Sequence, residues 1–256
     1  MEKIHLIEYH VVDHCNLNCK GCAHFSPLAN PWYARIEDFE KDLKRLTSLI
    51  EIERFCLFGG EPLLHPQLGE FCKIARKYLP NSDIFILSNG ITILEIIPSL
   101  VDILKENNIR MKFTQYPLKN VHYDEIENRL NSLGINCRIR KEKNGADKTL
   151  RHHVLSHERV KHQSNDDCIM LNVGSVQLRN GRLYLCPIQA YIDIYNNKYH
   201  ENYLADQFID IYSDDVTDKD ILDFCGKHND FCDFCRQPKE NNKYELSRQE
   251  KNEWAE

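Results

Sequence analysis

The sequence predicts an α/β fold built on an open parallel sheet. Strand-like and helix-like segments alternate through the first 140 residues, and the connections between them are short. Such alternation requires parallel strands joined by crossover helices. Five strands and four helices are expected, too few to close an eightfold barrel. Apolar residues make up 42% of the 256 residues, enough for a packed core. We therefore expect a partial, open, TIM-like barrel over residues 1–141.

The strands are predicted from short apolar runs that stop at turn-forming residues. They are expected at residues 4–12, 54–58, 83–88, 110–116 and 135–140. The second run stops at Gly59-Gly60, and the third stops at Asn89-Gly90. In parallel sheets of this kind the active site lies beyond the carboxyl ends of the strands.

The helices are predicted from apolar residues that recur every three or four positions. They are expected at residues 36–50, at 66–79, from Pro98 onward, and at 122–133. Pro98 is placed in the first turn of its helix, because the N–H groups there make no hydrogen bond within the helix and proline has no N–H. Gly134 suits the left-handed residue that ends the fourth helix.

A different organisation is expected after residue 141. Residues 142–167 are polar and form a connector, and four histidines at 152, 153, 157 and 162 are interpreted as part of a solvated segment. Residues 168–238 form a small second domain. It begins with two alternating runs around Asn180-Gly181, a strong hairpin signal, and includes a helix at 217–226. The polar tail 239–256 is expected to be mobile or a peripheral helix.

Composition excludes several classes of protein. The net charge of −6 argues against a broad nucleic-acid or anionic-lipid surface. No apolar run is long enough to span a membrane. Eleven cysteines without a secretory signal favour metal or thiol chemistry over disulfides, and a cytoplasmic location.

Three of these cysteines occupy one loop after the first strand. Cys15, Cys19 and Cys22 have the spacing C-x3-C-x2-C, so their thiolates can converge on one soft metal centre. A fourth ligand is missing nearby. Structural zinc normally has four protein ligands, whereas a [4Fe-4S] cluster can use an open iron.

The motif C15-NLN-C19-KG-C22 resembles the signature of the radical S-adenosylmethionine (SAM) enzymes. This resemblance implies that the open iron binds SAM and that an electron from the cluster cleaves it, giving a 5′-deoxyadenosyl radical that abstracts a hydrogen atom. Gly59-Gly60-Glu61-Pro62 resembles the family's GGEP motif, which implies that its backbone and Glu61 receive the SAM ammonium group.

The same resemblance suggests further contacts with SAM. Ser88 and Asn89 stand where the family contacts the ribose or carboxylate, and Arg138 or Arg140 is a candidate partner of the SAM carboxylate. The family often has an aromatic residue before the third cysteine, but here Gly21 takes that place. Phe25 is the candidate that replaces it against the adenine.

A second set of cysteines follows the connector. Cys168 and Cys186 flank the predicted hairpin, and Cys232 and Cys235 form a C-x2-C pair. Four thiolates suit a fully ligated [4Fe-4S] cluster or tetrahedral zinc. The pattern resembles the twitch form of the SPASM extension, which implies one auxiliary [4Fe-4S] cluster. Cys225 remains an alternative ligand or a hydrogen-atom donor.

Chain length, core size and cluster spacings resemble the radical SAM dehydrogenase of butirosin biosynthesis. The expected reaction is oxidation of a small carbohydrate- or cyclitol-type substrate, with electrons from a flavodoxin or ferredoxin. Alternatives are an epimerase that uses Cys225 and a peptide- or protein-modifying enzyme. Because the first cysteine lies at residue 15, no leader-binding domain is expected before it, which disfavours peptide substrates. Outside enzymes, the alternative is a zinc-binding interaction module.

Overall fold

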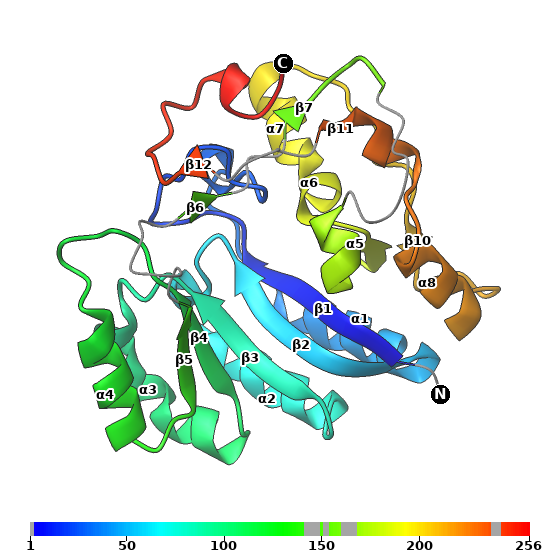
Figure 1. Ribbon diagram of the computed structural model, residues 1–256. Helices are drawn as coiled ribbons and strands as arrows, with labels where there is room; N and C mark the ends of the chain where they lie inside the picture. Colours follow the sequence, from blue (N-terminus) through cyan, green and yellow to red (C-terminus); the bar gives the residue numbers. More distant parts are fainter. Residues whose placement is uncertain (1–2, 141–148, 151–153, 160–167, 237–241) are drawn as a thin grey trace.

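A computed structural model describes residues 3–140, 149–150, 154–159, 168–236 and 242–256. Its main feature is an eight-stranded sheet in the order β10-β9-β8-β1-β2-β3-β4-β5 (Figure 1). The strands are β1 (Lys3–Val12), β2 (Glu51–Gly59), β3 (Asp83–Ser88), β4 (Arg110–Thr114), β5 (Cys137–Arg140), β8 (Ser175–Arg179), β9 (Arg182–Tyr184) and β10 (Ile209–Asp210). Strands β1 to β5 are parallel, as predicted, and the sheet is not closed into a barrel.

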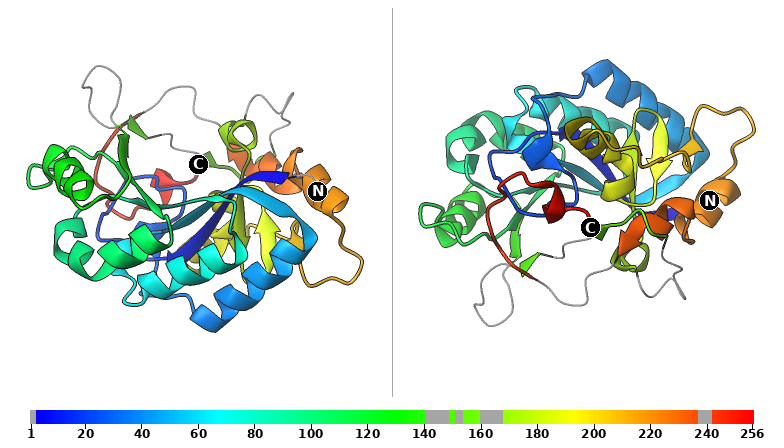
Figure 2. Two further views of the ribbon diagram at one scale, coloured as in Figure 1. Left: turned by 90° about the horizontal axis from the view of Figure 1, so that it is seen from below. Right: turned by 90° about the horizontal axis from the view of Figure 1, so that it is seen from above.

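Four helices cover one face of the parallel strands (Figures 1 and 2). They are α1 (Ile36–Leu49), α2 (Leu68–Tyr78), α3 (Ile93–Glu106) and α4 (Tyr123–Ser132). Tyr9 of β1 packs on Phe39 of α1, with ring centroids 4.7 Å apart. These buried contacts form the main core, and they fix the strand ends from which the candidate site is built.

The third helix begins earlier than the sequence predicts. Thr92 is its N-cap residue, so Pro98 lies inside the helix rather than in its first turn. The proline removes one backbone hydrogen bond. Ile93 and Ile97 are buried with exposed fractions of 0% and 1%, so their packing holds the first turn in spite of that loss.

The predicted hairpin is present, but it extends the main sheet. Asn180 and Gly181, with φ of 51° and 71°, form its turn. Strand β8 pairs in parallel with β1, and β9 and β10 follow antiparallel. The helices of this region are α5 (Ile169–Val173), α6 (Pro187–Ala190), α7 (Ile192–Tyr199) and α8 (Asp218–Cys225). The predicted helix at 217–226 is confirmed as α8, which the Thr217 side chain caps.

The last residues do not form the mobile or peripheral segment predicted from their polarity. Strand β12 (Asn242–Lys243) pairs with β6 (Thr149–Leu150), and β11 (Cys235–Arg236) pairs with β7 (Val154–Leu155). Trp254 is only 1% exposed and belongs to a second apolar core with Phe25 and Tyr195. Burial of this indole holds the C-terminal segment in place, although the polar flanking sequence does not predict that burial.

Most of the predicted connector lies outside the described residues, including the histidines at 152, 153 and 162. His157 is described: it is exposed, and its Nε2 atom lies 2.8 Å from Glu201. No helix in the described part of the chain is both long and apolar enough to cross a membrane.

Candidate functional site

The loop after β1 carries the first three cysteines, of which Cys19 is buried and Cys15 and Cys22 are partly buried. The backbone N–H of Leu17 donates to the Cys15 Sγ atom at 3.3 Å. Burial raises the pKa of Cys15, and the negative charges of Glu61, Cys22 and Cys19 raise it further. Burial also raises the pKa of Cys22. Adjacent thiols of this kind ionise readily only when a metal neutralises them, so the donor set fits a thiolate-bound metal centre.

The glycines after β2 let the chain pass directly against this loop. The N–H of Gly60 donates to Val12 O at 2.9 Å, and the N–H of Glu61 donates to His14 O at 3.1 Å. A Cβ atom on Gly60 would lie 2.1 Å from the His14 carbonyl oxygen. Only glycine permits this approach, so Gly60 holds the start of the cysteine loop at the end of β2.

Glu61 is a buried carboxylate that joins the ends of β2 and β3. Its Oε1 atom accepts from Ser88 Oγ at 2.7 Å and from the Leu63 N–H at 3.1 Å, and its Oε2 atom accepts from the Asn89 N–H at 2.8 Å. Burial raises its pKa to about 7, although these donors lower it. A carboxylate has about four acceptor positions, which leaves one for a further donor.

Asn89 extends this network to the first cysteine. Its Nδ2 atom donates to Asn16 Oδ1 at 2.7 Å and lies 3.8 Å from Cys15 Sγ. The backbone carbonyl of Asn89 accepts a hydrogen bond from the Tyr123 hydroxyl at 2.9 Å. The predicted residues Gly60, Glu61, Ser88 and Asn89 therefore meet around the cysteine loop, at the carboxyl ends of β1, β2 and β3.

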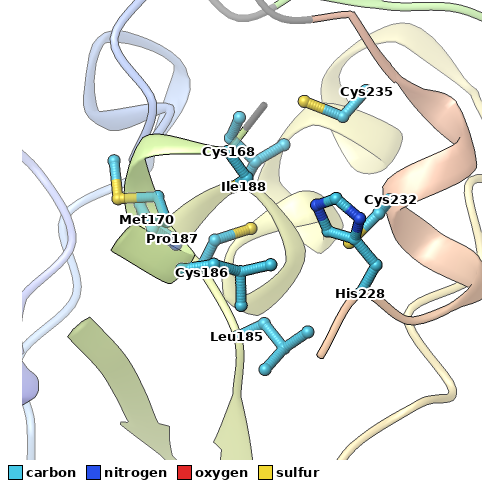
Figure 3. Close-up of a pocket in the computed structure, with 10 residues that line it drawn as sticks. Cys168, Met170, Leu185, Cys186, Pro187, Ile188, His228, Cys232 and Cys235 are labelled. Atoms are coloured by element: carbon cyan, nitrogen blue, oxygen red, sulfur yellow. The ribbon is translucent and has the colours of Figure 1, made fainter. Parts of the chain in front are cut away.

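The second set of cysteines surrounds an apolar pocket (Figure 3). Cys168 precedes α5, Cys186 precedes α6, and Cys232 and Cys235 lie at a short helical turn that begins after Asn229. The other lining residues are Met170, Leu171, Leu185, Pro187, Ile188 and His228. In Figure 3, Cys186 and Cys235 turn their sulfur atoms toward the space between them.

Electrostatics confirms that these four thiols are neighbours. Burial raises the pKa of Cys186 to about 12, and the charges of Cys232 and Cys168 contribute to that rise. Burial raises the pKa of Cys235, with contributions from the other three cysteines. The apolar lining penalises thiolate charge, so the donor set fits a cationic centre that would take four thiolates.

A match to a protein-family model identifies the loop that carries Cys15, Cys19 and Cys22. The model of the radical SAM superfamily matches residues 9–143, just over half of the chain, including the cysteine loop and the strand ends around it. The chain belongs to the radical SAM superfamily. The resemblance drawn from the C-x3-C-x2-C motif is therefore confirmed, and membership implies SAM and a [4Fe-4S] cluster as cofactors.

Two curated relatives are similar to part of the chain, and both are named GTP 3′,8-cyclase. The one from Nautilia profundicola is 31% identical over 102 residues, which is 39% of this chain and 32% of the relative. The one from Microcystis aeruginosa is 28% identical over 116 residues, which is 43% of this chain and 33% of the relative. The chain thus matches about a third of the length of these relatives.

A solved structure is similar over nearly the whole chain. It is BtrN in complex with AdoMet and 2-DOIA, with a TM-score of 0.56 and 18% sequence identity. The match covers 92% of this chain and 94% of BtrN. At this identity the likeness shows the fold, and it confirms an open radical SAM barrel rather than a closed one.

Three residues predicted to contact SAM, namely Phe25, Arg138 and Arg140, do not join the hydrogen-bonded network around Glu61 and Asn89 in the part of the chain that the structure describes. Phe25 has a left-handed backbone with φ of 52°. It is 1% exposed and packs on Tyr195 and Trp254, with ring centroids 5.5 and 6.5 Å away. These contacts occupy the ring that was expected to face adenine. Arg138 and Arg140 are exposed on the edge strand β5.

Cys225 does not join the second set of cysteines. It ends α8 and packs against the main core. Burial alone raises its pKa to about 12, with no contribution from another thiol. It does not line the pocket shared by Cys168, Cys186, Cys232 and Cys235.

Two tyrosines near the radical SAM loop were missed by the sequence analysis. Tyr116 and Tyr244 pack with ring centroids 5.3 Å apart. Burial raises the pKa of Tyr116, and Cys19, Cys22 and Cys15 add to the rise. Burial likewise raises the pKa of Tyr244, with Cys19 and Cys15 contributing. No motif links residues so distant in sequence, so only tertiary structure reveals the pair.

A group of polar side chains lies between segments that carry the two sets of cysteines. His24, two residues after Cys22, lies 2.7 Å from His10 (Nδ1 to Nε2). His10 stacks on Tyr191 with ring centroids 3.7 Å apart, and the Arg179 guanidinium lies 4.4 Å from the same tyrosine ring. Tyr191 follows α6, which begins just after Cys186.

Proposed function

We propose that this protein cleaves SAM reductively and uses the resulting radical to remove hydrogen from a carbinol carbon of a small polyhydroxylated substrate, oxidising it to a ketone. The observation that carries the proposal is the pocket formed by Cys168, Cys186, Cys232 and Cys235 behind a radical SAM core. After hydrogen abstraction, oxidation to a ketone still requires loss of one proton and one electron. A second cluster near the substrate is a suitable electron acceptor.

We assign Cys15, Cys19 and Cys22 as ligands of the SAM-binding cluster, and the four pocket cysteines as ligands of an auxiliary one. When bound, the clusters and SAM supply the electron transfers and the hydrogen-abstracting nucleoside. The residues of the chain position SAM and supply charged groups that bind it. Gly59 and Gly60 permit close backbone approach, and the free acceptor position on Glu61 suits an ammonium group.

Four other residues complete the assignment of the SAM site. Ser88 and Asn89 hold Glu61 in place from the end of β3. Asn89 is also close enough to Cys15 to orient that thiolate. Arg138 or Arg140, each exposed on the edge strand β5, is the candidate partner of the SAM carboxylate.

The four pocket thiols suit a [4Fe-4S] cluster or tetrahedral zinc. We propose the cluster because the pocket accompanies a radical SAM core, and iron and zinc analysis of the protein distinguishes the two.

We propose that polar side chains between the two cysteine groups face the hydroxyl groups of the substrate. Asp13, Arg179 and Asn180 line a cavity of about 10 Å³ with Tyr191 at the ends of β1 and β8, which is room for about one water molecule, so the substrate would lie outside it. Burial, together with the positive charge of Arg179, lowers the pKa of His10 well below its usual value, so its imidazole is neutral. We place the substrate beside this group, between the two cysteine sites.

Oxidation is favoured over epimerisation by the position of Cys225. An epimerase needs a thiol that faces the substrate radical, whereas the partly buried Cys225 packs against the main core and does not line the auxiliary pocket. Further support comes from the likeness to BtrN, a radical SAM dehydrogenase, over nearly the whole chain. A flavodoxin or ferredoxin is proposed as the electron donor.

The test is substrate-dependent transfer of deuterium. A set of polyols and aminocyclitols deuterated at their carbinol carbons is incubated anaerobically with the reconstituted enzyme, SAM and dithionite. Deuterium in 5′-deoxyadenosine together with a ketone product supports dehydrogenation. Deuterium transfer with an inverted, unoxidised product supports epimerisation. Colourless protein that contains zinc and no iron supports the interaction module.

A further inference from the structure

The last residues of the chain return to the first cysteine loop. The N–H of Lys20 donates to Glu245 O at 3.0 Å, and the N–H of Ser247 donates to Asn18 O at 2.8 Å. The Asn18 side chain donates back to Ser247 O at 2.7 Å. Figures 1 and 2 show the red C-terminal segment beside the blue loop. Residues 242–256, here called the C-terminal strap, therefore pair with the loop between its cysteines.

Two residues of the strap contact cysteines of the loop: Leu246 forms a β-bridge with Cys19, and Trp254 contacts Cys22. The Trp254 indole Nε1–H donates to the carbonyl oxygen of Cys22 at 3.0 Å. The side chain is 1% exposed, and it packs against Phe25, whose N–H donates to the same carbonyl at 3.0 Å. An indole nitrogen is a donor only, so the indole adds a second buried hydrogen bond to the Cys22 peptide.

The backbone of Trp254 bonds to strand β7. The carbonyl of Trp254 accepts from the Leu155 N–H at 2.7 Å, and the Leu155 carbonyl accepts from the Glu256 N–H at 2.9 Å. Leu155 lies opposite Cys235 in the β7–β11 pair, and the adjoining Ser156 N–H donates to Phe234 O at 2.8 Å. Trp254 is therefore bonded both to Cys22 and to the strand residue that lies opposite Cys235.

We propose that Trp254 is a positioning residue for the first metal centre: its indole N–H fixes Cys22, and its backbone bonds to β7 hold it beside β11, the strand that carries Cys235. The inference rests on the assignment of Cys22 as a cluster ligand. It assigns a functional role to the C-terminal strap. The strap belongs neither to the radical SAM motifs nor to the pocket of the second set of cysteines.

Trp254→Phe tests the indole N–H, because phenylalanine keeps an aromatic ring and every backbone bond of residue 254. Amide hydrogen exchange is measured on the full-length, metal-free protein. Loss of one buried hydrogen bond should speed exchange in residues 15–24 roughly fivefold, whereas strand β3 should be unchanged. Trp32→Phe is the matched control, since Trp32 is 40% exposed and its contacts to the loop are made by its backbone.

The reconstituted proteins provide a second measurement. We expect Trp254→Phe to lose the first cluster to air roughly fivefold faster than the wild type, while the auxiliary cluster bleaches at the wild-type rate. Each cluster is followed separately in a background where the other site carries a Cys→Ala change. Equal exchange and equal bleaching in Trp254→Phe and Trp32→Phe would overturn the proposal.

A third variant covers the case in which the phenylalanine protein does not fold. Trp254→His keeps a ring N–H in a smaller side chain. The proposal predicts slower exchange of residues 15–24 in this variant than in Trp254→Ala, and equal exchange contradicts it. If the wild type fails to bind iron, the proposed function is rejected. The exchange result still decides whether Trp254 positions the loop, because exchange is measured without metal.

Discussion

The Nδ2 atom of Asn89 lies 3.8 Å from the Sγ atom of Cys15, although 74 residues separate them. Asn89 follows β3, and Cys15 lies in the loop after β1, so the contact joins two strand ends that are not neighbours in the sheet. The strand between them, β2, contributes Glu61, which accepts the Asn89 N–H at 2.8 Å. The three strand ends thus form one hydrogen-bonded unit around the first thiol.

Asn89→Ala should therefore weaken SAM binding without unfolding the protein. The change removes the 2.7 Å bond to Asn16 and frees the Cys15 loop. We expect about a five- to tenfold increase in the dissociation constant for SAM, measured by equilibrium binding to the reconstituted protein. Asn131→Ala, at an exposed position of α4, is the control and should bind SAM as the wild type does. Equal affinities would contradict a role for Asn89.

Gly60→Ala should disrupt the cysteine loop, because its Cβ atom would meet the His14 carbonyl at 2.1 Å. We expect a loss of at least about 2 kcal/mol in the free energy of unfolding and a marked loss of iron from the first site. Chemical denaturation and iron analysis measure the two effects. Gly226→Ala is the matched control: its Cβ atom would make an ordinary 3.6 Å contact with Leu222 O, so its stability should change by less than about 1 kcal/mol.

Glu61 should give the metal-free protein a distinctive pH dependence. Burial raises its pKa from 4.5 to about 7, so the folded state holds the proton more tightly than the unfolded state. Its favourable contribution is complete below pH 4.5 and is lost as pH rises through 7. Relative to Glu61→Gln, the wild type should lose on the order of 3 kcal/mol over this range. Parallel stability profiles for the two proteins would show that the carboxyl titrates normally.

Cysteine variants should separate ligands from packing residues. Wild-type protein with two [4Fe-4S] clusters should contain about eight irons per chain. Cys186→Ala should retain about four irons, because its thiol borders the auxiliary pocket. Cys225→Ala should retain about eight irons and full turnover, because this thiol packs against the main core. Loss of turnover with intact iron in Cys225→Ala would instead identify it as a hydrogen-atom donor.

The sequence predicts most of the core because its signals are local. Apolar periodicity predicts α1 and α2, and Asn180-Gly181 predicts the hairpin. The C-x3-C-x2-C and GGEP motifs point to Cys15 and Glu61 through their resemblance to the radical SAM family. These signals depend on neighbouring residues, and tertiary contacts reinforce them.

The errors come from contacts between distant segments. The packing of Ile93 and Ile97 extends α3 across Pro98, which the local rule for proline does not foresee. The bond from Asn18 to Ser247 spans 229 residues, and the buried Trp254 is surrounded in sequence by polar residues. Nothing local shows that this strap, or the Tyr116–Tyr244 pair, lies near the first cysteine loop. Residue polarity alone therefore does not predict how the C-terminal segment packs.

The most direct test of the account is whether Cys15, Cys19 and Cys22 support reductive cleavage of SAM. Anaerobically reconstituted protein is treated with dithionite and SAM, and 5′-deoxyadenosine is measured by chromatography and mass spectrometry. We predict its formation by the wild type and its absence in the Cys15→Ala, Cys19→Ala and Cys22→Ala variants. No 5′-deoxyadenosine from wild-type protein with full iron content would contradict the central claim.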